Sequence, residues 1–120
     1  MEFIGIDDEK ASLSITPPEL DSIIKILQFT LVELEHEYFT RTGFYESETE
    51  ALVTKLENAP DRNNIGITNQ ELLNLRQNLV EVLFAISNID FESQYKLSRD
   101  AVNTLFEEID RYGKQHGAWN

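Results

Sequence analysis

The residues of this chain that could support metal or acid–base chemistry are two histidines and many carboxylates. Glu33 and His36 have the Glu-x-x-His spacing with which helix bundles bind a di-iron centre. Such a centre needs a second Glu-x-x-His pair and two further carboxylates, but the corresponding positions of a later helix are Ala85 and Asn88. His116 lies in a tail flanked by glycines. We therefore expect no metal site and no cofactor.

Carboxylate pairs such as Glu46 and Glu50 are abundant, as they must be in a chain with 22 acidic residues. General acid–base catalysis needs a pair whose environments separate the two pKa values, and no pair is marked in that way. The sequence has no cysteine, no glycine-rich phosphate loop and no nucleophile elbow. We predict that the protein has no catalytic residues and is not an enzyme.

The net charge is the strongest global signal, because 22 acidic residues oppose only 10 basic ones and leave −12. Nucleic acids and anionic membrane surfaces would repel this chain, whereas a basic protein partner would be attracted to it. The other interpretation is that the charge only maintains solubility. There is no apolar run of about 18 residues and no signal-peptide pattern at the start, so we predict a soluble cytoplasmic protein.

The sequence pattern predicts that the histidines and carboxylates are positioned by a mostly helical domain. Phe3 to Ile6 and the alternating pattern around Leu13 predict two short strands joined by residues 7–10. Four main helices follow, each with a capping signal at its start: Thr16 with Glu19, Ser47 with Glu50, Thr68 with Glu71, and Ser98 with Ala101. The first helix has apolar residues on more than one side and should end near Gly43, and Gly113 should end the last helix.

The sequence also repeats itself. With an offset of 52 residues, the segment that begins at Ile15 matches the segment that begins at Ile67, including its cap, its apolar positions and an aromatic residue further along. We predict a single domain built from two pseudo-repeated helical hairpins that pack into one core. Its parts are a β-hairpin (1–16), a first helical hairpin (16–58), a linker (59–66), a second helical hairpin (67–112) and a tail (113–120).

Several side chains fall outside the main apolar stripes and are candidates for contact with a partner. We interpret five of them as an interface: Ile26, Phe29, Leu73, Val80 and Phe84.

Two more residues are candidates for recognition. Arg41 stands among aromatic residues, where it either braces a bend or acts as a binding hot spot. Trp119 is either frayed or docked into a groove.

These features favour a non-enzymatic protein–protein interaction module that self-associates as a homodimer. One alternative is an immunity or antitoxin-like inhibitor that neutralises a basic toxin, which the acidity would favour. Another is a small ligand-binding or metal-binding helical bundle with a site between the two repeats.

Overall fold

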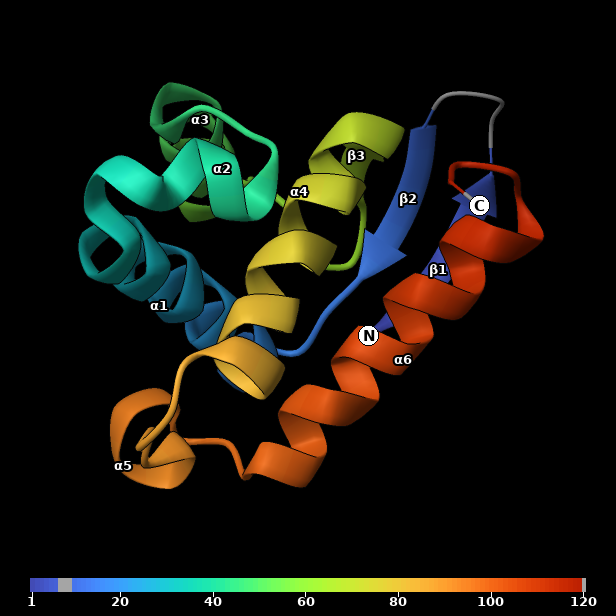
Figure 1. The fold of residues 1–120 in the computed structure, drawn as a ribbon. Coiled ribbons are helices and arrows are strands. Elements are labelled where there is room, and N and C mark those ends of the chain that lie inside the picture. Colours follow the sequence, from blue (N-terminus) through green and yellow to red (C-terminus); the bar gives the residue numbers. More distant parts are fainter. Residues whose placement is uncertain (7–9, 120) are drawn as a thin grey trace.

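The computed structural model describes residues 1–6 and 10–119 of the chain (Figure 1). Strands β1 (Glu2–Ile6) and β2 (Lys10–Ser14) form the predicted antiparallel hairpin. Most of the predicted connection between them, residues 7–9, lies outside the described residues. The register shifts between Phe3 and Gly5, so this pairing is irregular at Ile4.

A third strand, β3 (Ile65–Thr68), pairs with β2 in an antiparallel sheet of order β1-β2-β3. The end of the predicted linker 59–66 is therefore strand, which corrects that part of the prediction. Ile65 and Ile67 are buried while Gly66 is exposed, the alternation expected when one face of a strand meets a core. A strand of four residues beside a run of Asn and Asp gives little periodic signal in sequence.

The first helix, α1 (Pro17–Leu34), begins as predicted with a capping box. The Glu19 N–H donates to Thr16 Oγ1, and Glu19 Oε1 accepts from the Thr16 N–H at 3.1 Å. After α1 the chain forms a short 3₁₀ turn, η1 (Glu35–Glu37), and helix α2 (Tyr38–Thr42). Gly43 ends this run with a φ of 82°, a left-handed conformation that glycine adopts without strain.

Helix α3 (Glu46–Glu57) begins before the predicted cap at Ser47. Its cap residue is Tyr45, whose N–H donates to Glu48 Oε1 at 2.9 Å. The prediction was wrong by about two residues because Gly43 turns the chain sharply and buried Phe44 fixes where the next helix can start.

The second half contains α4 (Asn69–Val80), a π-helical turn η2 (Glu81–Ala85), the short helix α5 (Phe91–Tyr95) and α6 (Arg99–Gln115). The caps at Thr68 and Ser98 are both confirmed. Gly113 does not end α6, which continues to Gln115. Helix α5 was not predicted as a separate element.

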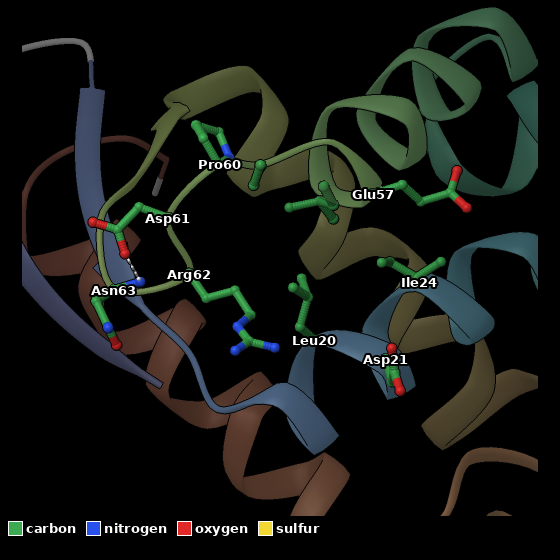
Figure 2. Close-up of a pocket in the computed structure, with 10 residues that line it drawn as sticks. Leu20, Asp21, Ile24, Glu57, Pro60, Asp61, Arg62 and Asn63 are labelled. Atoms are coloured by element: carbon green, nitrogen blue, oxygen red, sulfur yellow. Dashed lines mark hydrogen bonds between the residues drawn. The ribbon is translucent and has the colours of Figure 1, made fainter.

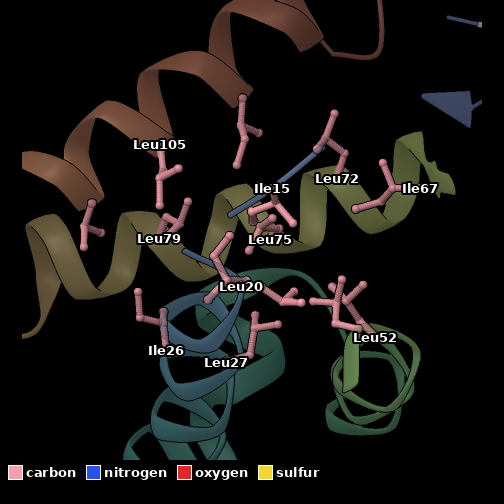
Figure 3. Packing of buried hydrophobic residues seen from close by; sticks show 14 of the residues in the cluster. Ile15, Leu20, Ile26, Leu27, Leu52, Ile67, Leu72, Leu75, Leu79 and Leu105 are labelled. Atoms are coloured by element: carbon pink, nitrogen blue, oxygen red, sulfur yellow. The ribbon is translucent and has the colours of Figure 1, made fainter. Parts of the chain in front are cut away.

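The predicted fold class is confirmed: the chain is mostly helical, with a short N-terminal hairpin and four main helices. Helix α4 lies in the middle, with α6 on one side and α1 on the other, and α3 packs against α1 (Figure 1). Leucine and isoleucine side chains from these helices and from the strands fill the space between them (Figure 3). No described helix has both the length and the apolar character needed to cross a membrane.

The internal duplication stays a prediction. One local feature agrees with it: Leu13 lies opposite Ile65, and these two positions are 52 residues apart, the same offset that aligns the repeats. An antiparallel pair in which a residue faces its own counterpart is what a two-fold relation would produce. The halves also differ, because α4 passes into a π-helical turn where α1 passes into η1 and α2.

Candidate functional site

The exposed aromatic side chains of the described residues gather at two places, and the first is where α2 meets α3. The rings of Phe39 and Tyr45 stack with their centroids 4.5 Å apart and their planes 25° from parallel. Phe39 is 49% exposed and Tyr45 is 61% exposed. The tight return through Gly43 produces this contact, because it brings the start of α3 back beside α2.

Several exposed glutamates lie close to Phe39 and Tyr45 in sequence. Glu35 and Glu37 precede Phe39 by four and two residues, Glu46 follows Tyr45 directly, and all three are exposed. We call this set, Glu35, Glu37, Phe39, Tyr45 and Glu46, the acidic aromatic surface. Between positions 33 and 50 the chain carries six glutamates and one arginine, a local net charge of −5. This segment is the most acidic part of the described chain.

Arg41, the one cation of that segment, is held by carboxylates on both sides. Its Nη2 lies 2.7 Å from Glu81 Oε1, and its Nη1 lies 3.9 Å from Glu37 Oε2. The Glu81 side chain is only 8% exposed, and no aligned hydrogen bond from the described residues reaches its Oε1. The close ion pair therefore compensates the burial of that carboxylate. Arg41 thus braces α2 against η2, in agreement with the structural interpretation of this residue.

Beneath the acidic aromatic surface lies a buried network of hydrogen bonds. Tyr38, next to Phe39 in sequence, donates through its hydroxyl to Asn78 Oδ1 at 2.8 Å and lies 2.6 Å from Thr49 Oγ1. Asn78 Oδ1 also accepts from Thr30, and Thr49 donates to Asn74 Oδ1 at 3.0 Å. The network joins α1, α2, α3 and α4 and holds the base of the surface in one arrangement.

The second exposed aromatic site lies along α4 and η2. Val80 is half-buried and belongs neither to the main core nor to a smaller buried cluster formed by Leu34, Tyr38 and Phe44. Phe84, four residues on, is 62% exposed. Phe84 also makes an edge-to-face contact with Phe106 of α6 at 5.7 Å. Leu73 lies nearer the start of α4 and packs partly on that smaller cluster. We call Leu73, Val80, Phe84 and Phe106 the α4 face.

Two of the five predicted interface residues contact the main core of this chain. Ile26 is fully buried, and Phe29 packs against the core with its ring 6.0 Å from that of Tyr95 in an edge-to-face contact. The reason is that α3, α4 and α5 pack on α1 and cover these two side chains, whereas Val32, further along the same helix, is 74% exposed. Sequence periodicity shows that a side is apolar but not what covers it.

Trp119 is docked against α6. An added Cβ on Gly113 would lie 2.0 Å from the Trp119 ring, so the absent side chain of Gly113 provides the space for the indole. The Trp119 Nε1–H donates to Asp110 Oδ1 at 3.4 Å, and the Arg76 guanidinium lies 6.0 Å from the ring centroid. Docking, one of the two predicted states of Trp119, is the one observed, and the contacts make its role structural.

An open groove of about 590 Å³ lies between α1, the end of α3 and the segment that leads to β3 (Figure 2). Leu20, Ile24 and Leu56 line its base. Its border is polar, with Asp21, Glu57, Asp61, Arg62 and Asn63. Small-molecule sites are typically enclosed and mostly apolar, so this shape gives little support to the ligand-binding alternative.

Two titratable groups among the described residues have strongly shifted pKa values, Tyr95 and Asp110. No three of the described His, Asp and Glu side chains converge on a point that could hold a metal ion. Burial, with the charge of Glu33 added, raises the pKa of Tyr95 to about 12, so its hydroxyl stays protonated at neutral pH. Burial alone would raise the pKa of Asp110, but hydrogen bonds from Lys114 and Arg76 outweigh it and lower that pKa to about 2.

Comparison of the chain with protein-family models, curated proteins and solved structures finds no match.

Proposed function

We propose that this protein is a non-enzymatic interaction module that forms a homodimer through the α4 face. The observation that carries the proposal is Phe84, which is 62% exposed and stands beside half-buried Val80 and Phe106. An aromatic side chain at the centre of an apolar face is the usual anchor of a protein interface. The same helix also packs in the centre of the domain, so the face is rigid before it binds.

The distribution of charge favours a second copy of this chain at the α4 face. Residues 1–66 carry 14 acidic and 5 basic residues, whereas residues 67–120 carry 8 acidic and 5 basic residues. The net charge of the second half is therefore −3, against −9 for the first. Along α4 itself the single acidic residue, Glu71, is balanced by Arg76. Two copies that meet through α4 bring their less acidic halves together, which lowers the repulsion between them.

The alternative site for self-association, the edge of the sheet, has less support. The edge strand β1 is irregular at Ile4, and such bulges interrupt the regular ladder that edge-to-edge pairing needs.

The α4 face is small, so we expect a weak dimer. A stable interface buries roughly 800 Å² on each partner, more than these four side chains supply alone, and contacts around them must contribute the rest. We expect a dissociation constant of roughly 10–100 μM, since one aromatic anchor leaves only a small surplus over the cost of association.

Size-exclusion chromatography with light scattering over a series of concentrations tests the proposal. The average mass should rise with concentration and lie roughly midway or more between monomer and dimer at about 100 μM. Phe84→Glu should remain a monomer because it places a charge opposite its own copy across the two-fold axis. Phe39→Ala is the matched control, since it removes a comparably exposed ring from another surface. A monomeric chain at the highest concentration, or equal weakening by both substitutions, would refute the proposal.

A further inference from the structure

We propose that the acidic aromatic surface binds a Lys- or Arg-rich segment of a second protein. This binding does not depend on dimerisation, because the surface is formed by η1, α2 and α3, whereas the α4 face is formed by α4, η2 and α6. Two kinds of group that recognise cations occur together here: aromatic rings with accessible faces and a set of carboxylates.

The stacked rings provide the first part of the recognition. Phe39 and Tyr45 contact each other through one face, and their exposed fractions of 49% and 61% leave much of each ring open to solvent. A guanidinium or ammonium group over the face of an aromatic ring is attracted by its quadrupole. The aliphatic stem of the same side chain covers apolar ring surface that is now in contact with water.

The carboxylates provide the second part. Glu35, Glu37 and Glu46 are exposed and lie within four residues of Phe39 or Tyr45 in sequence. Arg41, the cation closest to them in sequence, is engaged by buried Glu81 at 2.7 Å. Because the charge of Arg41 is used within the fold, it neutralises little of the charge that a partner would meet. The local net charge of −5 between positions 33 and 50 attracts a basic segment and accelerates its encounter.

The surface is already arranged before a partner binds. Glu35 has a φ of 47°, a backbone angle that residues other than glycine rarely adopt. This residue redirects the chain from α1 into η1. Tyr38 and Thr42, on the inner side of α2, are buried and hydrogen-bonded, and Thr42 Oγ1 donates to the Tyr38 carbonyl at 2.8 Å. With its inner side fixed, α2 presents Phe39 outward at little further cost in conformational entropy.

Other occupants of this surface are disfavoured by charge. A second copy of this chain would bring another −12 to the most acidic part of the molecule, and nucleic acid would bring its phosphates. A basic protein segment is the partner whose charge and side-chain chemistry both complement the surface.

Fluorescence anisotropy with a fluorescein-labelled peptide of about twelve alternating Gly and Arg residues tests the inference. The peptide should bind at low salt, a Gly/Gln peptide of the same length should not, and Phe39→Ala with Tyr45→Ala should weaken binding roughly fivefold or more. Tyr45→Phe retains the ring and should retain the affinity, which separates loss of the ring from loss of the fold. Phe84→Ala should leave peptide binding unchanged even if it abolishes the dimer.

A second comparison distinguishes this surface from the charge of the whole protein. Glu35→Gln with Glu46→Gln should weaken binding roughly three- to tenfold, whereas Glu57→Gln with Glu92→Gln, an equal change in charge at two exposed positions elsewhere, should alter it less than about twofold. Equal weakening by both pairs would mean that the peptide senses only the net charge. That result, or the absence of binding by the unaltered chain, would overturn the inference.

Discussion

Replacing Gly113 with alanine tests whether Trp119 is docked on α6. Gly113 is buried inside the helix, and the added methyl group would lie 2.0–2.3 Å from three atoms of the indole ring. Helical backbone cannot move by that amount without losing its hydrogen bonds, whereas Trp119 follows the end of the helix and can leave. We therefore expect the substitution to expel the indole and to leave α6 intact.

Two opposing contributions set the magnitude. Alanine is about 1 kcal/mol more favourable than glycine inside a helix. The docked indole covers roughly 100 Å² of apolar surface, worth about 2.5 kcal/mol, and ordering the last residues of the chain offsets about half of that. The gain and the loss are similar, so Gly113→Ala should change the free energy of unfolding by less than about 0.5 kcal/mol. In a Trp119→Ala background the same substitution should stabilise by about 1 kcal/mol.

The assay uses the only tryptophan of the chain as its own reporter. Emission from Trp119 should move to longer wavelength in Gly113→Ala because the ring enters water, while far-ultraviolet circular dichroism should stay unchanged. Urea unfolding of the single and double variants then gives the coupling energy between the two positions. Unchanged emission, or the same stabilisation in both backgrounds, would refute the docked arrangement.

Two further predictions concern ion pairs. Arg41→Ala should destabilise the protein by about 2 kcal/mol in urea unfolding, because it leaves the Glu81 carboxylate buried and unpaired. In a Glu81→Gln background the same substitution should cost less than about 1 kcal/mol. The lowered pKa of Asp110, about 2 instead of 3.8, stabilises the fold above pH 4, and this contribution is lost as the pH falls toward 2. After allowance for solvent screening, this contribution amounts to about 1 kcal/mol. In unfolding titrations, Asp110→Asn should therefore cost about 1 kcal/mol at pH 7 and nearly nothing at pH 2. Equal costs at both pH values would contradict the lowered pKa of Asp110.

The sequence predicted much of the local structure because the signals involved are local. The caps at Thr16, Thr68 and Ser98 depend on a side chain and a backbone N–H three residues apart, and each is found where the spacing predicts it. The hairpin follows from alternation over a few residues. Where the sequence failed locally, at Ser47, the turn at Gly43 decided the outcome. At Gly113 the helix continues to Gln115, and the Trp119 ring packs on the glycine.

The candidate surfaces were less predictable, since exposure depends on what packs from elsewhere. Ile26 and Phe84 are both off the main apolar stripes, yet one is fully buried and the other is 62% exposed. The stacking of Phe39 on Tyr45 depends on the return at Gly43, and the partner of Arg41 is Glu81, forty residues away. Spacing along a helix would instead pair Arg41 with Glu37, four residues before it, but that carboxylate lies at 3.9 Å.

By itself, then, the sequence determined the acidity of this protein, the type of its main elements and the apolar side of each helix, because those properties reside in residues close together along the chain. Only the tertiary structure decided which apolar sides remain uncovered, how β3 completes the sheet, and which charges are neutralised within the fold. Those outcomes depend on contacts between segments that are distant in sequence. Such contacts form only when the whole chain closes around one core.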